Sequence, residues 1–269
     1  MSIIRGMDFS NPTSADMLLL ESIKPVYICS HKGREYKINC PSEVIRWRAE
    51  TYFTKEPDTI NWIEDFDPSD VLLDIGANIG LYTVFAASRG NKVIVFEPES
   101  QNFSELNINV YLNKVHDKVD CFSIALSGEN KIDDLYIPTF GKGFALSNLG
   151  SPEDWCKESF SPDHVQKTIT YSIDSFLDAY PDYFPNQIKI DVDGHESSVV
   201  NGGKHTFSDP RVKSVLIELN EDLTDDMEII DIFSSHGLLF RSKYHHPMFD
   251  KSDFASVYNY IFSREKLTH

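Results

Sequence analysis

The chain has 269 residues, and its hydrophobic content of 41% suits one α/β core with a small addition. Its net charge of −17 opposes phosphate backbones, so we expect no nucleic acid among its partners. No apolar run approaches the ~20 residues of a membrane span, so we expect none.

Residues 1–66 are predicted to form an N-terminal extension that packs on the core. Two short strands, near 26–29 and 35–38, flank a hairpin-like turn. Two helices are expected near 42–53 and 57–66. The extension is therefore predicted to be a small α/β addition.

Residues 67–269 have the pattern of a doubly wound domain, because strand-like apolar runs alternate with helix-like segments. Most runs are continuous, as burial of a parallel sheet on both faces requires. The last two runs are predicted to pair antiparallel at one edge, so the sheet is expected to be seven-stranded and mostly parallel. Strands are expected near 71–75, 92–96, 119–124, 187–191, 213–219, 237–241 and 256–262, and helices near 80–88, 100–112, 173–179, 196–202 and 224–236.

The alternation breaks between residues 127 and 171, where glycines and prolines stand among polar residues. Residues 134–137 and 167–171 are predicted to form an antiparallel pair outside the main sheet. An insertion of this length beside a ligand site is often a lid or a substrate loop. A solvated surface excursion is the alternative.

The first chemical motif runs from Asp74 to Gly80, at the end of the first core strand. A dinucleotide site needs three glycines that bring backbone N–H groups to a pyrophosphate, and here Asn78 stands at the middle position. Asp74 would repel a pyrophosphate but suits an ammonium group. Glu97, at the end of the next strand, suits ribose hydroxyls. The motif therefore favours S-adenosylmethionine over NAD, although a plain strand–helix turn with a coincidental acid is the alternative.

A second group of polar residues follows the fourth core strand, where Asp191, Asp193 and His195 are expected to face the same cleft. These three are candidates for proton transfer, and His195 has the ordinary pKa closest to neutrality. The alternative is that Asp193 and Glu196 are acids at a helix terminus, which the helix dipole favours.

Lys189 lies inside this strand and is predicted to form a buried ion pair with Asp191. Asp191, Glu218 and Asn220 could together offer oxygen ligands to a divalent cation. The match is loose, so we predict that no metal is required. Glu218 and Asn220 would then bond loops or substrate hydroxyls.

Several motifs resemble those of the FkbM-type family of S-adenosylmethionine-dependent methyltransferases. They are residues 74–82, 96–98, 125–127 and 188–196, with further similarity around 51–63. The resemblance covers roughly residues 45–262 and implies a Rossmann-like fold and methyl transfer to a hydroxyl, often on a sugar or natural product. It implies that Asp74, Gly76, Asn78 and Gly80 bind the methionine moiety, that Glu97 beside Pro98 holds the ribose, that Ala125 lies near the adenine, and that Lys55 and Glu56 close over the cofactor.

The sequence therefore predicts an S-adenosylmethionine-dependent O-methyltransferase acting on a sugar, glycan or other natural product. A base among His195, Asp191 and Asp193 would remove the acceptor proton. A cofactor-binding partner protein without catalysis and an NAD-dependent oxidoreductase are the alternatives. Four cysteines without C-x-x-C spacing are typical of reduced thiols and favour a cytoplasmic location. A homo-oligomer is compatible with the sequence.

Overall fold

The main sheet of the computed structural model, which describes residues 11–264, has seven strands: β3 (Val71–Ile75), β4 (Lys92–Phe96), β5 (Val119–Phe122), β10 (Gln187–Ile190), β11 (Ser214–Asn220), β12 (Leu239–Tyr244) and β13 (Val257–Ser263). Their order across the sheet is β12-β13-β11-β10-β3-β4-β5. Strand β13 pairs antiparallel with β11 and β12, and all other pairs are parallel. The predicted doubly wound, mostly parallel sheet with an antiparallel edge is therefore confirmed.

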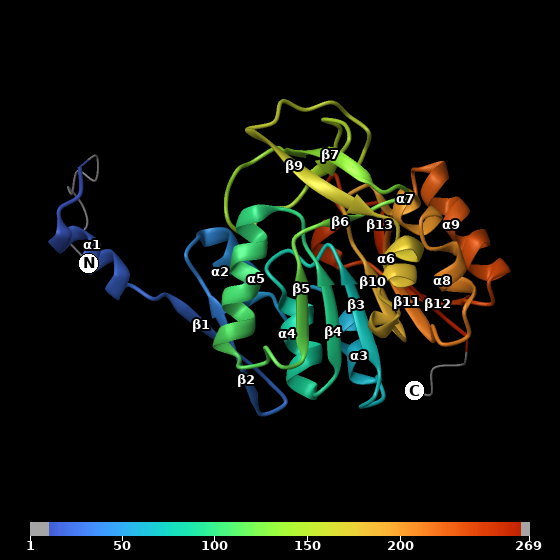
Figure 1. Ribbon diagram of the computed structural model, residues 1–269, viewed down its shortest axis with the longest axis horizontal. Coiled ribbons are helices and arrows are strands. Elements are labelled where there is room, and N and C mark those ends of the chain that lie inside the picture. Colours follow the sequence, from blue (N-terminus) through green and yellow to red (C-terminus); the bar gives the residue numbers. More distant parts are fainter. Residues whose placement is uncertain (1–10, 265–269) are drawn as a thin grey trace.

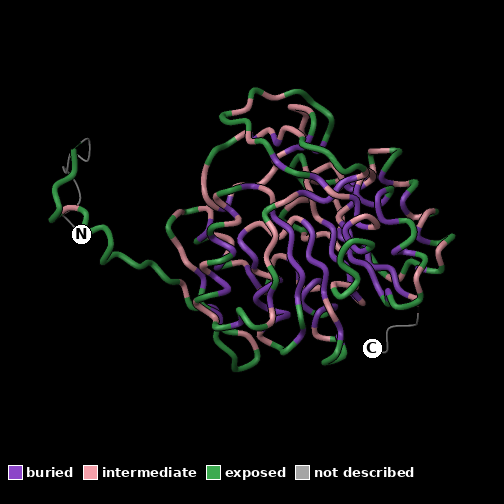
Figure 2. Tube along the Cα trace, in the orientation of Figure 1, coloured by how far each residue is buried: buried purple, intermediate pink, exposed green. Residues whose placement is uncertain are grey.

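Helices cover both faces of this sheet because alternate side chains of each strand enter different hydrophobic clusters. Leu72 and Val93 belong to one cluster, and Leu73 and Ile94 belong to the other. The first cluster includes α3 (Pro57–Glu64), α4 (Leu81–Arg89) and α5 (Ser100–Leu112); the second includes α6 (Ile173–Ala179), α7 (Glu196–Asn201), α8 (Lys204–Ser208) and α9 (Thr224–Ser235). The buried strands lie between these layers (Figures 1 and 2).

The N-terminal extension packs on the first cluster through the hairpin of β1 (Val26–His31) and β2 (Arg34–Asn39) and through α2 (Glu43–Glu50). The predicted hairpin is confirmed, but α2 is shorter than expected because a turn over residues 51–54 follows it. Helix α1 (Ser14–Ser22) was not predicted; it has no buried residue and projects from the body (Figure 1).

The insertion forms a second, four-stranded sheet from β6 (Ala125–Leu126), β7 (Lys131–Ile137), β8 (Asn148–Leu149) and β9 (His164–Tyr171). The predicted antiparallel pair is confirmed by β7 and β9, which pair over the whole length of β7. In Figure 1 this sheet lies beyond the carboxyl ends of the parallel strands. It is therefore placed to cover a site at those ends.

The structure also bears on the expectations of no membrane span and of reduced thiols. Within residues 11–264, no helix combines the length and apolar character needed to cross a bilayer. All four cysteines are free thiols, as their spacing predicts.

Candidate functional site

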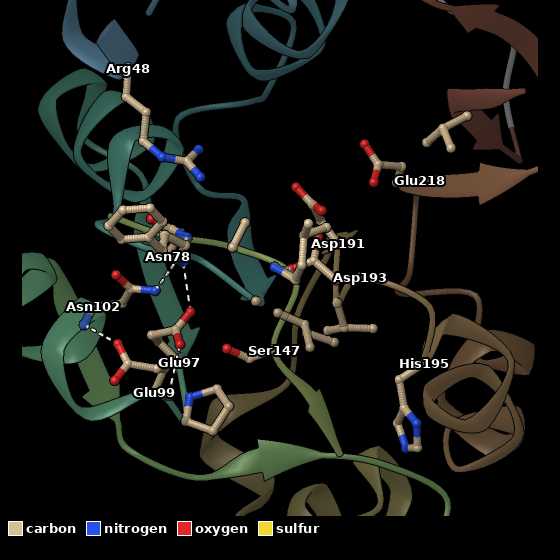
Figure 3. Close-up of a pocket in the computed structure, with 18 of the residues that line it drawn as sticks. Arg48, Asn78, Glu97, Glu99, Asn102, Ser147, Asp191, Asp193, His195 and Glu218 are labelled. Carbon is tan, nitrogen blue, oxygen red and sulfur yellow. Dashed lines mark hydrogen bonds between the residues drawn. The ribbon is translucent and has the colours of Figure 1, made fainter. Parts of the chain in front are cut away.

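A cavity of about 420 Å³ opens at the carboxyl ends of β3, β4, β10 and β11. This volume is typical of small-ligand sites, and the strand ends of a doubly wound sheet are where such sites form. The lid segment, which we define as residues 138–149 of the insertion, lines one wall, and α2 and residues 244–249 line others. Figure 3 shows polar side chains that converge on the cavity from several of these elements.

The turn between β3 and α4 forms the floor of the cavity. Gly76 has φ +77°, and a Cβ there would lie 1.9 Å from the Asp191 carbonyl oxygen. Only glycine therefore lets the ends of β3 and β10 approach this closely. Gly76 and Asn78 line the cavity, but Gly80 does not: it begins α4 with φ +77° and packs against Leu106.

Glu97 lines the cavity at the end of β4 and is held by backbone groups. Its carboxylate accepts hydrogen bonds from the N–H of Asn78 (2.7 Å) and the N–H of Glu99 (2.8 Å). Burial raises the pKa of Glu97 to about 8, against the effect of these two bonds. Pro98 and Ala125 line the same end of the cavity. The structure therefore brings these three predicted cofactor residues together.

Asp74 does not line the cavity, in contrast to the expectation that it contacts the cofactor. Strand alternation directs its side chain toward the α4 face, where it accepts a hydrogen bond from Thr83 at 2.5 Å. It is fully buried beside Lys189, its register partner on β10, and burial raises its pKa. Asp74 is thus placed to act on the site only through its neighbours.

The buried Lys189 forms the predicted ion pair with Asp191, at 2.7 Å. Burial alone would lower the pKa of Lys189, but Asp191, Asp74 and Glu56 together raise it. Glu56 reaches the cavity wall, where it pairs with Lys55 at 2.9 Å and accepts a hydrogen bond from Tyr82 at 2.8 Å. Burial opposes the ionisation of Glu56, but Lys55 and Lys189 lower its pKa to about 2.

Asp191, Asp193 and Glu218 form a carboxylate cluster on the opposite wall, with ligand atoms within 4.8 Å of one another. Burial and the charge of Asp191 raise the pKa of Asp193 to about 6 and that of Glu218 well above its ordinary value. This spacing is compatible with a divalent cation. Asn220 does not line this cavity, and its side-chain oxygen accepts from the N–H of Asp222 at 3.0 Å in a turn.

His195 lines the cavity but is separate from the carboxylate cluster. Its Nε2 lies 3.0 Å from the hydroxyl of Ser127, and its ring is directed away from the three carboxylates (Figure 3). Burial, with a contribution from Lys157, lowers the pKa of His195 to about 4. The imidazole is therefore neutral at pH 7 and a weak base.

Sequence reasoning missed the contacts that hold the lid segment over the cavity, although it named Asn78 and Asp193 for other roles. Asn78 and Asn102 both donate to the Phe144 carbonyl at 2.9 Å, and Arg48 donates to the Gly143 carbonyl at 2.7 Å. The N–H of Leu146 donates to Asp193 at 2.7 Å. These pairs are 42–95 positions apart, so local patterning carries no signal for them.

Comparisons with known proteins agree with this architecture. The model of the methyltransferase FkbM domain matches residues 74–240, which is more than half of the chain. A solved methyltransferase FkbM from Methylobacillus flagellatus KT superposes with a TM-score of 0.50 and 16% identity, over 73% of this chain and 44% of that one. This chain therefore spans less than half of the length of that protein, and the likeness shows the fold alone.

Two further structures are similar only weakly. A precorrin-6y C5,15-methyltransferase from Geobacter metallireducens GS-15 has a TM-score of 0.44 and 13% identity, over 81% of this chain and 93% of that one. The magnesium protoporphyrin IX methyltransferase of Synechocystis PCC 6803, solved with bound SAM, has a TM-score of 0.48 and 9% identity, over 83% and 85%. No curated protein matches significantly. On the strength of the domain match, the chain belongs to the FkbM family of methyltransferases.

Proposed function

We propose that this protein is an S-adenosylmethionine-dependent methyltransferase that methylates a hydroxyl oxygen of a sugar, glycan or other natural product. The observation that carries the proposal is that the two ends of the cavity hold different arrangements of carboxyl groups. One end holds Glu97, fixed by two backbone N–H groups, and the other holds the carboxylate cluster of Asp191, Asp193 and Glu218. The cavity thus has one end suited to the cofactor and another, which we call the chemical end, suited to proton removal from an acceptor.

The residues at the Glu97 end fit the cofactor. Glu97 has free lone pairs for two ribose hydroxyls, and Pro98 and Ala125 offer an apolar wall for an adenine. Gly76 and Asn78 line the cavity beside this end and would contact the methionine moiety. When bound, S-adenosylmethionine supplies an activated methyl group. The protein then has to align an acceptor oxygen with it and remove one proton.

Asp193 is the proposed base. Its pKa of about 6 is nearer neutrality than that of an ordinary carboxyl, which suits proton removal at pH 7. Asp191 is committed to its ion pair with Lys189. The charge of Asp193 also contributes to raising the pKa of Glu218, so the protonation of these two carboxyls is not independent. His195 is disfavoured by its low pKa and its contact with Ser127.

The chemical end also suits a hydroxylated acceptor. Trp47, Tyr244, Phe249 and Phe254 line the cavity and offer aromatic faces to the apolar side of a sugar ring. The carboxylate cluster offers acceptors to its hydroxyls. This combination of apolar walls and a few placed polar groups supports a sugar-like acceptor over a purely apolar one.

Binding and turnover test the proposal. S-adenosylhomocysteine should raise the melting temperature, because a ligand that binds only the folded state stabilises it, whereas NAD should not. A panel of hydroxylated acceptors should then show methyl transfer with a labelled cofactor. A shift with NAD alone would overturn the cofactor assignment. Binding of S-adenosylhomocysteine without turnover on any acceptor would instead favour a non-catalytic partner protein.

A further inference from the structure

Arg48, on α2, is an unassigned cation at the cavity. Its Nε donates to the Gly143 carbonyl at 2.7 Å, which fixes the direction of the guanidinium. Figure 3 shows the terminal nitrogens directed into the cavity, with Asn78 between Arg48 and Glu97 in this view. The guanidinium therefore faces the space that a ligand would occupy.

The terminal nitrogens of Arg48 have no hydrogen bond or ion pair with any of residues 11–264. Two neighbouring cations differ in this respect: Arg46 bonds Glu43 at 2.8 Å and also pairs with Glu50, and Lys55 pairs with Glu56. Arg48 forms no ion pair with any described residue, although its charge acts to lower the pKa of Asp193. In a chain of net charge −17, a partly buried arginine whose terminal nitrogens are unpaired is informative. Its planar fork matches a carboxylate, which it can bind through two parallel hydrogen bonds.

The order of groups along the cavity identifies this carboxylate. If Glu97 holds the ribose, a methionine moiety that passes Asn78 would bring its amino acid end toward Arg48. On the facing wall, Asp191 and Glu218 of the carboxylate cluster suit an ammonium, which leaves Asp193 as the proposed base. A cation on one wall and anions on the other match a zwitterion.

We infer that Arg48 binds the carboxylate of the cofactor's methionine moiety. This assignment rests on the proposed function. Arg48 would then contact both the cofactor and the lid segment, because the same guanidinium donates to the Gly143 carbonyl. An acidic group on the acceptor is the competing ligand for Arg48, and a cofactor analogue that lacks only the carboxylate distinguishes the two ligands.

Calorimetry on Arg48→Gln tests the assignment with two ligands. One is S-adenosylhomocysteine, and the other is its decarboxylated analogue, in which an aminopropyl group replaces the amino acid. Glutamine can still donate to the Gly143 carbonyl, so the lid contact is retained. We expect Arg48→Gln to lower the affinity for S-adenosylhomocysteine by about 10- to 100-fold and the affinity for the analogue by less than about twofold. The wild-type protein should bind the analogue about 10- to 100-fold more weakly than it binds S-adenosylhomocysteine.

Two control variants complete the test. Arg46→Gln, on the same helix but paired with acids, should change neither affinity. Arg48→Lys keeps the charge but not the fork, and should give an intermediate loss. An unchanged S-adenosylhomocysteine affinity in Arg48→Gln, or an equal loss for both ligands, would overturn the assignment. If S-adenosylhomocysteine does not bind the wild type at all, the proposed function itself fails.

Discussion

At one end of the cavity, Glu97 is held by backbone N–H groups of Asn78 and Glu99, and at the other end Glu218 accepts no hydrogen bond from residues 11–264. Glu97 is buried and Glu218 is partly buried, and desolvation raises the pKa of each. The difference lies in what surrounds them. Glu97 is pre-organised to receive a ligand, whereas the carboxylate cluster keeps acceptor capacity for a substrate, a proton or an ammonium.

This contrast matches the two tasks of a methyltransferase site. Cofactor recognition gains from fixed geometry, since little ordering entropy is then lost on binding. Proton removal gains from carboxyls whose protons are held less rigidly and whose pKa lies near neutrality. Substitutions at the two ends should therefore affect different quantities.

The largest effect is expected from Asp193→Asn. The amide oxygen can still accept from the Leu146 N–H, so the lid contact survives while the base is lost. Turnover should fall by about 10²- to 10⁴-fold, with the affinity for S-adenosylhomocysteine within a few-fold of wild type. Asp178→Asn, at an exposed site on α6, is the matched control. Near-normal turnover in Asp193→Asn would remove Asp193 from the proposed base role.

Glu97→Ala should act at the other end, on affinity. Loss of charge-assisted hydrogen bonds to the ribose should weaken S-adenosylhomocysteine binding by about 1–3 kcal/mol, measured by calorimetry. Glu97→Gln should lose less, because one acceptor oxygen remains. Glu228→Ala, an exposed acid on α9, controls for net charge. An unaltered affinity in Glu97→Ala would place the ribose elsewhere.

The affinity for S-adenosylhomocysteine should also depend on pH through Glu97. Ribose hydroxyls that donate to Glu97 favour its ionised form, but the free carboxyl has a pKa of about 8. Below pH 8 binding must therefore release a proton, so affinity rises with pH and levels off above about 8. We expect a gain of about tenfold between pH 6.5 and 8.5. Glu97→Gln should flatten this profile, and an equally steep profile in that variant would assign the titration to another group.

The fold could be predicted from the sequence because its signals are local. Each core strand is a short apolar run, and the Gly76 turn and Glu97 follow directly from strand ends. The orientation of Asp74 was missed because strand alternation, not proximity to the turn, decides which face a side chain takes. Helix α1 was missed since it buries nothing and so has no clear amphipathic pattern.

The partners of Arg48, Asn78 and Asn102 lie in an irregular loop far along the chain, up to 95 positions away. No periodicity reports such a contact. The roles of His195 and Asp193 could not be separated from sequence either, because ordinary pKa values favour the histidine. The burial and contacts of the two groups in the fold raise the pKa of Asp193 above that of His195, which makes Asp193 the better candidate base.

A smaller effect is expected from His195→Ala, which tests whether the imidazole belongs to the chemical end. A neutral ring with a pKa of about 4 is a poor proton acceptor at pH 7, and its Nε2 is already beside the Ser127 hydroxyl. Turnover should fall by less than about fivefold. Rates measured from pH 6 to 9 would show this. A loss of about 10²-fold or more, with unchanged cofactor affinity, would return the base role to His195.

The smallest effect is expected from removal of divalent cations. The spacing of Asp191, Asp193 and Glu218 would admit a cation, but Lys189 already places a buried positive charge 2.7 Å from Asp191. This charge offsets part of the repulsion among the three carboxylates, which a bound metal would otherwise relieve. The sulfonium of a bound cofactor would add a second positive charge at the same end of the cavity. We therefore expect EDTA to change turnover by less than about twofold, and added magnesium to restore nothing. Activity that a chelator abolishes and magnesium restores would make the three carboxylates metal ligands. The acidic cluster would then be a metal site whose cation activates the acceptor hydroxyl, and the difference between the two ends of the cavity would be one of ligand type.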